Sequence, residues 1–132
     1  MKQRTSQILF AYWNDVRGDR MAPRRLDIEP ARISEILAET FIVEREDSRT
    51  YPFRLAGTRI CDQLGIELRG RNLIELVEHE DQAKLEAALA SITGQGSVGV
   101  FDLEAHDRQG RPVRFEMLVL PLIHVRQAVT RY

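Results

Sequence analysis

Residues 98–120, VGVFDLEAHDRQGRPVRFEMLVL, decide the fold class of this chain. Apolar and polar residues alternate on both sides of a short turn that runs from Asp107 to Gly110. Alternation with a period of two is typical of a strand, and an Asp- and Gly-containing turn between two such runs is typical of a β-hairpin. We expect Val98, Val100, Leu103 and Ala105 to form the first strand, and Val113, Phe115, Met117 and Val119 to form one face of the second.

The second strand of this hairpin is apolar on its other face as well. Leu118, Leu120 and Leu122 alternate with the first set. A strand that is apolar on both sides is covered on both sides. We therefore expect one face to line the core and the other to meet the N-terminal helix or a partner.

Shorter elements precede the hairpin. Residues 41–44 and 51–56 predict two strands joined by a turn, with Tyr51, Phe53 and Leu55 on one face of the second strand. Apolar residues at helical spacing then predict short helices near residues 60–64 and 73–77. A longer helix follows residues 80–81, and glycines at 94 and 96 end it.

The N-terminal part, residues 1–39, is predicted to form an amphipathic helix, a linker that contains two prolines, and a short helix. Residues 40–132 would form the core domain. Two interpretations of the first helix stay open, because its apolar face either lies on its own domain or docks on a second subunit. In the second case the chain is a homodimer with Leu9, Tyr12, Trp13 and Val16 at the interface.

Composition excludes several classes of function. The chain has 132 residues, which suits one domain, and a formal net charge of −1, which argues against nucleic acid as the main partner. No apolar stretch approaches the ~20 residues that span a bilayer, and no signal-peptide pattern follows the first residues. One cysteine, Cys61, excludes an internal disulfide and suits a reducing compartment. We expect a cytoplasmic protein of bacterial type.

No pattern of catalytic or metal-binding residues is present in the sequence. The three histidines and Cys61 have no metal-ligand spacing, and no Gly-x-Ser-x-Gly or Gly-x-Gly-x-x-Gly motif occurs. A nucleophile needs an activating base and an orienting group, and the sequence indicates neither. We expect no metal, no cofactor, no catalytic residue and no enzymatic activity.

Several motifs, taken in order, resemble those of PAS domains. Residues 70–82 (GRNLIELVEHEDQ) are similar to the PAS segment that leads into the long helix, and residues 101–116 (FDLEAHDRQGRPVRFE) resemble the PAS hairpin. Residues 12–13 (YW), 20–23 (RMAP), 27–30 (DIEP) and 53–58 (FRLAGT) are similar to a subfamily of short stand-alone bacterial PAS-like proteins. His79 is expected just before the long helix, which would then carry no histidine for haem, and residues 60–64 do not resemble the flavin-adduct cysteine motif.

The resemblance implies an α+β fold, in which an antiparallel sheet carries short helices on one face. It also implies an apolar cavity between the sheet and these helices. The expected ligand-binding residues are Phe53, Leu55, Cys61, Leu64, Leu73, Leu76, Phe115 and Met117, unless all eight simply fill the core. The fifth strand of such a sheet would fall at residues 128–132, where it is short or missing, so that a partner chain could complete the sheet.

The function implied by the resemblance is a non-catalytic sensory or signalling domain that binds another protein. A small molecule in the apolar cavity is a second expected partner, whereas nucleic acid and membrane are not expected. The alternative is a dimerisation or interaction module without a ligand, whose core is filled by its own side chains.

Overall fold

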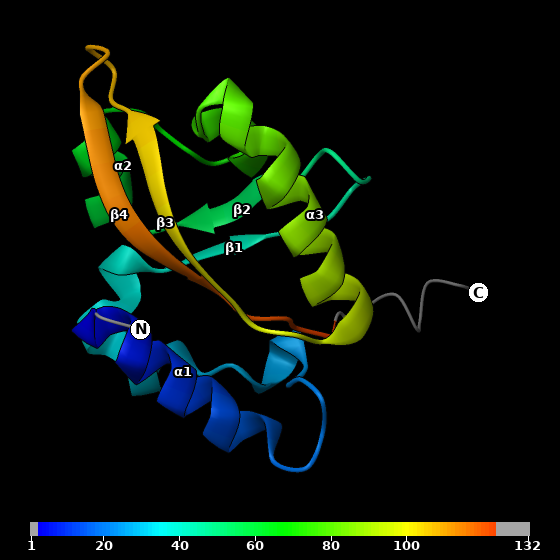
Figure 1. Ribbon diagram of the computed structural model, residues 1–132. Helices are drawn as coiled ribbons and strands as arrows, with labels where there is room; N and C mark the ends of the chain where they lie inside the picture. The colour runs from blue at the N-terminus through cyan, green and yellow to red at the C-terminus, as the bar shows by residue number, and fades with distance from the viewer. Residues whose placement is uncertain (1–2, 124–132) are drawn as a thin grey trace.

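A computed structural model describes residues 3–123 of the chain. The α+β class and the PAS-like order of elements are confirmed (Figure 1). The helices are α1 (Arg4–Arg17), α2 (Thr58–Leu64) and α3 (His79–Gln95), with 3₁₀ helices η1 (Arg25–Asp27), η2 (Pro30–Glu39) and η3 (Leu73–Leu76). The strands are β1 (Phe41–Val43), β2 (Phe53–Ala56), β3 (Gly99–His106) and β4 (Pro112–Val119).

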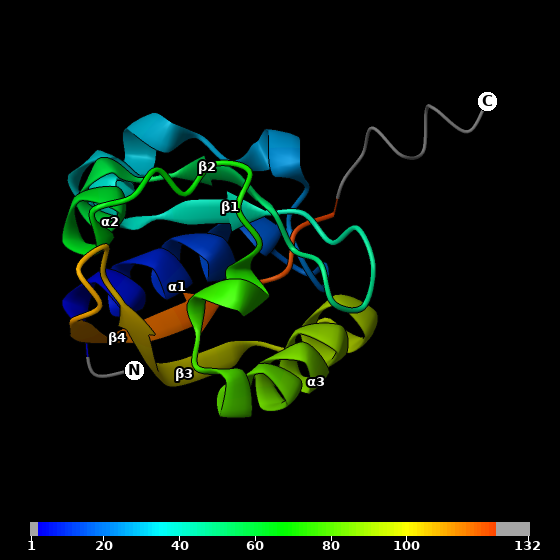
Figure 2. The same cartoon turned by 90° about the horizontal axis from the view of Figure 1, so that it is seen from above.

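The described strands form two antiparallel pairs, β1–β2 and β3–β4. Helix α3 packs against β3 and η3, whereas α1 packs against η2 and β4. Figures 1 and 2 show α1 beneath the two hairpins, along the line between them. The predicted closing strand at residues 128–132 lies outside the described residues. No helix in the described part of the chain is both long enough and apolar enough to cross a bilayer.

The C-terminal hairpin forms as predicted, with β3 paired to β4. Residue Phe101 faces Met117, and Ala105 faces Val113, so the inward set of β3 is Phe101, Leu103 and Ala105. Val100 points outward with 44% of its surface exposed, and Val98 precedes the strand with 38% exposed. Of the four residues predicted for this strand, Val98 therefore falls just outside it. Val100 lies on the opposite face from Leu103, because strand faces alternate and the two positions differ by an odd number.

Two separate groups of apolar side chains are buried. The main cluster contains only residues between 41 and 119, and it fills the space among the two hairpins, the short helices and α3. The N-terminal cluster is built from Tyr12, Ile33 and Ile36, against which Ile8, Leu9, Val16 and Ile28 pack. The two clusters lie on either side of residue 39, where the sequence predicts the boundary between the N-terminal part and the core domain. Helix α1 also packs on β4, so the two parts are in contact, and the boundary stays a prediction.

Candidate functional site

Seven of the eight predicted ligand-binding residues belong to the main cluster. Four of them are buried, and three are partly buried and pack against the buried ones. They come from β2, α2, η3 and β4, so the fold brings together residues that are up to 64 positions apart in the sequence. The buried members are Phe53, Leu64, Leu73 and Met117, and the partly buried ones are Cys61, Leu76 and Phe115.

Leu55 is the exception, and its predicted place in the core was wrong. Its side chain is 48% exposed. The register explains the difference: Ile42 faces Leu55 and Val43 faces Phe53, so Arg54 is an extra residue in β2. A β-bulge of this kind interrupts the period of two. Phe53 therefore points into the core and Leu55 points away from it.

Tyr51 is a cluster member that the ligand prediction did not include. Its side chain is 1% exposed, and its hydroxyl oxygen has no hydrogen-bond partner among the described residues. An unsatisfied buried polar group costs roughly 1–3 kcal/mol of stability. The alternation with Phe53 predicts that the ring is buried, but no sequence signal shows whether the hydroxyl has a partner.

The backbone around Tyr51 is held firmly. Its amide N–H donates to Oδ1 of Asn72 over 2.9 Å, and its carbonyl accepts from the amide of Leu73 over 3.0 Å. The same Oδ1 accepts from the amide of Ile74 over 3.2 Å, which caps η3. Asn72 thus ties the start of β2 to the helix that leads toward α3. This fixes the position from which the Tyr51 ring enters the core.

The best-formed hollows of the described residues contain few of the predicted ligand-binding residues. The two best-formed hollows of the described residues are shallow and open to solvent. One is lined by Gln3, Asp102, Leu103, Arg114, Phe115 and Glu116, and the other by Cys61, Asp62, Gly65, Ile66 and Glu67. Each therefore contains only one of the eight predicted ligand-binding residues, so neither is an enclosed cavity at the predicted site.

The four predicted interface residues of α1 are engaged within the chain. Tyr12 and Trp13 are 7% and 5% exposed, and Leu9 and Val16 are partly buried against the N-terminal cluster. The Tyr12 hydroxyl accepts a hydrogen bond of 2.7 Å from the amide of Glu29. The structure describes a single chain, so self-association stays a prediction, but the interpretation in which this face lies on its own domain accounts for both aromatic residues.

A carboxylate anchors the linker after α1. Asp27 Oδ2 accepts hydrogen bonds of 2.9 Å from the backbone amide of Arg24 and from Nη1 of Arg20, and Oδ1 accepts one of 3.2 Å from Nη2 of Arg24. Hydrogen bonds from the Arg24 side chain and backbone, and then from Arg20, hold the pKa of Asp27 well below its usual value. These contacts fold the basic linker back on itself.

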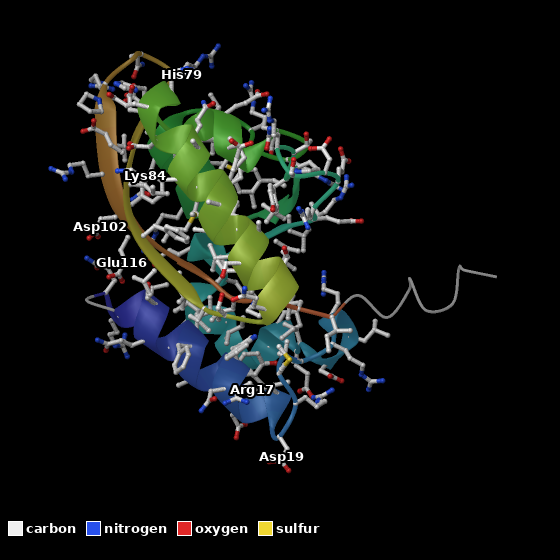
Figure 3. The ribbon with its side chains drawn as sticks, turned by 45° about the vertical axis from the view of Figure 1, so that its right-hand side comes forward. Arg17, Asp19, His79, Lys84, Asp102 and Glu116 are labelled. Atoms are coloured by element: carbon white, nitrogen blue, oxygen red, sulfur yellow. The ribbon has the colours of Figure 1, made fainter. Side chains whose placement is uncertain are left out.

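Titratable side chains elsewhere are spread over the surface. His106 Nδ1 lies 2.8 Å from Glu78 Oε1, which joins the end of β3 to the start of α3. Figure 3 shows His79 at one end of the molecule and Arg17 and Asp19 at the other. The expectation that His79 lies just before the long helix differs from the structure by one residue, because α3 begins at His79. Within residues 3–123, no group of three or more histidine, cysteine, aspartate or glutamate side chains is arranged to hold a metal ion.

Two antiparallel hairpins around one buried apolar cluster, flanked by short helices and one longer helix, define a small α+β domain. A family model described as PAS domain matches residues 1–132, so the chain belongs to the PAS domain family. Comparisons with curated proteins and with solved structures find no match. Family membership therefore supports a sensory, signalling or interaction module, without a relative that specifies its partner.

Proposed function

We propose that the chain is a non-catalytic, cytoplasmic PAS-type signalling domain that binds a small molecule in its core and transmits that event to a protein partner. The observation that carries the proposal is the main cluster, which brings together seven of the predicted ligand-binding residues and one hydroxyl without a partner among the described residues. Ligand sites are mostly apolar with few convergent polar groups. This cluster has that composition.

The route from core to surface would pass through β4. Met117 belongs to the main cluster, and its neighbour Leu118 is buried on the opposite face of the strand. Helix α1 packs on β4, and Trp13 is hydrogen-bonded just beyond that strand. A ligand that shifts β4 would therefore also shift α1. Such a shift requires the ligand to bind one arrangement better than the other.

A second copy of the chain is one partner included in the proposal. Of the predicted interface residues, Leu9 and Val16 keep more exposed surface than Tyr12 and Trp13. A Leu9→Ala,Val16→Ala double variant that folds like the wild type and sediments as a smaller species would support a dimer at this face. Identical sedimentation of the two proteins would place any self-association elsewhere.

The second candidate function is an interaction module that has no ligand. The shape of the described part of the chain favours it, because neither of the best-formed hollows is enclosed or centred on the predicted ligand residues. In that case the cluster would stabilise the domain only, and its surface would carry the function.

Native mass spectrometry on freshly purified protein separates these two candidates. A species heavier than the bare chain by the mass of a small organic molecule supports the sensor. That extra mass must disappear after denaturation, which serves as the control for covalent modification. The bare chain alone in several independent preparations supports the module without a ligand.

A further inference from the structure

The Tyr51 hydroxyl is the one buried side-chain oxygen or nitrogen among the described residues that lacks a hydrogen-bond partner. The ring is 1% exposed and lies in the main cluster. Two backbone hydrogen bonds, to Asn72 and from Leu73, fix the residue at its place. The backbone hydrogen bonds therefore fix where the Tyr51 side chain enters the core, and its hydroxyl is buried away from solvent.

Tyr12, the other tyrosine within the described residues, shows what a satisfied hydroxyl looks like in this chain. The Tyr12 hydroxyl accepts a hydrogen bond of 2.7 Å from the backbone amide of Glu29. In contrast, a phenylalanine at position 51 would fill the same space without an unpaired polar atom. Because leaving such an atom unpaired destabilises a protein, the hydroxyl brings a benefit only when something binds to it.

We propose that the Tyr51 hydroxyl is the polar recognition group of the core and donates a hydrogen bond to an oxygen of a small, largely apolar, uncharged ligand. This inference rests on the proposed sensory function and specifies the ligand class for that site. The other side chains of the cluster are aliphatic, aromatic or sulfur-containing, so they offer a ligand no charged or strongly polar partner. A charged ligand would lose its hydration without compensation, and it is excluded for that reason.

Space for the ligand has to come from side-chain movement. Met117 is a member of the cluster, and methionine is unbranched and adapts to new neighbours more readily than other apolar residues. Leu76 and Phe115 are only partly buried and pack at the edge of the cluster. Displacement of these side chains would open the cluster that also contains Tyr51, and displacement of Met117 and Phe115 would move β4.

The test compares two probes of similar size and shape. Acetophenone carries a carbonyl oxygen, and isopropylbenzene replaces that oxygen with a methyl group. We expect the wild type to bind acetophenone about threefold to tenfold more tightly than isopropylbenzene, which is the net effect of one hydrogen bond. We expect Tyr51→Phe to abolish this preference. Dissociation constants from isothermal titration give the comparison directly.

Resistance to urea tests the unpaired state of the Tyr51 hydroxyl independently, in the absence of any ligand. We expect Tyr51→Phe to be at least as resistant to urea as the wild type, because no hydrogen bond is lost. The matched control, Tyr12→Phe, removes the acceptor of the Glu29 amide and should be less resistant. A loss of stability in Tyr51→Phe as large as in Tyr12→Phe would overturn the inference, since the hydroxyl would then already be paired by water or by residues 124–132.

The outcomes also separate this inference from the proposed function. Equal binding of both probes to the wild type and to Tyr51→Phe would overturn the role of the hydroxyl and would leave a small-molecule site in the core. Absence of binding by either probe overturns the inference as well, and together with a bare-chain native mass it would also contradict the sensory function.

Discussion

The indole Nε1 of Trp13, on helix α1, donates a hydrogen bond of 2.9 Å to the carbonyl oxygen of Pro121, just beyond strand β4. The two residues are 108 positions apart in the sequence. The Trp13 side chain is 5% exposed. Helix α1 is therefore a structural part of the domain, and it is positioned to respond to movement of β4.

Substitutions of Trp13 are expected to destabilise the chain. Trp13→Phe keeps an aromatic ring but removes the hydrogen bond to Pro121, which should cost about 1 kcal/mol. Trp13→Ala also removes most of the buried surface and should cost about 3–5 kcal/mol. Urea denaturation measures both values. A Trp13→Ala variant that keeps wild-type stability while self-association weakens in analytical ultracentrifugation would instead support the predicted dimer interface.

Gly57 is expected to tolerate no side chain. A Cβ atom there would lie 2.2 Å from the carbonyl oxygen of Ala38, a backbone atom that cannot move aside without displacing η2. Gly57→Ala should therefore lower the melting temperature substantially. The matched control is Gly94→Ala in α3, where a Cβ meets nothing within 4 Å. This control should stabilise the helix by about 0.5–1 kcal/mol. Similar melting temperatures for the two variants would contradict the close approach of α2 to η2.

Asp27 is expected to contribute to stability in a way that depends on pH. Its hydrogen bonds from Arg24 and Arg20 depress the pKa of the folded state below the usual 3.8. A carboxyl group with a depressed pKa stabilises the fold above its unfolded-state pKa, and the contribution is lost as the pH falls toward the folded-state pKa. The difference in unfolding free energy between wild type and Asp27→Asn should thus stay constant from about pH 7 to 5 and shrink below about pH 4.

The control for this experiment is Asp19→Asn, which alters a carboxylate outside the Arg20–Asp27–Arg24 contacts. We expect its effect to be smaller than that of Asp27→Asn at neutral pH. An Asp27→Asn difference that changes between pH 7 and 5, or that persists unchanged to pH 3, would contradict the assigned contacts.

Two cross-strand pairs of charged residues on the β3–β4 hairpin allow the register to be tested by reversing one charge in each pair. Asp102 lies directly opposite Glu116, whereas Glu104 lies opposite Arg114. Like charges in directly opposed positions are destabilising, and opposite charges are favourable by about 0.2–1 kcal/mol. Asp102→Lys should therefore stabilise the chain and Glu104→Lys should destabilise it. Both effects should decrease in high salt, because the Debye length falls. The same sign for both variants would contradict the register.

The sequence predicted the C-terminal hairpin because the turn and the alternation of apolar residues that determine it are close together in the chain. The turn at residues 107–110 and the alternation in β4 placed Phe115 and Met117 on the core side, as the structure shows. The outward position of Leu55 was missed because the bulge at Arg54 arises from pairing with β1. Sequence alternation carries no signal for such an extra residue in one partner strand.

Contacts between distant segments could not be predicted. The amphipathic pattern of α1 indicated an apolar face with Tyr12 and Trp13, but it did not distinguish its own domain from a second subunit. The structure gives both side chains partners in the same chain, at Glu29 and Pro121. The unpaired hydroxyl of Tyr51 was equally beyond prediction, because a missing partner is a property of the whole assembled core.

The most direct test of ligand binding in the core uses the three methionines of the chain, Met1, Met21 and Met117. Met117 is 4% exposed in the main cluster, whereas Met21 is 64% exposed and serves as an internal control. In NMR spectra of methyl-labelled protein titrated with acetophenone, we expect the Met117 signal to shift and saturate while the Met21 signal stays in place. A Met117 signal that remains unchanged, or one that moves only in parallel with Met21, would contradict a small-molecule site in the core.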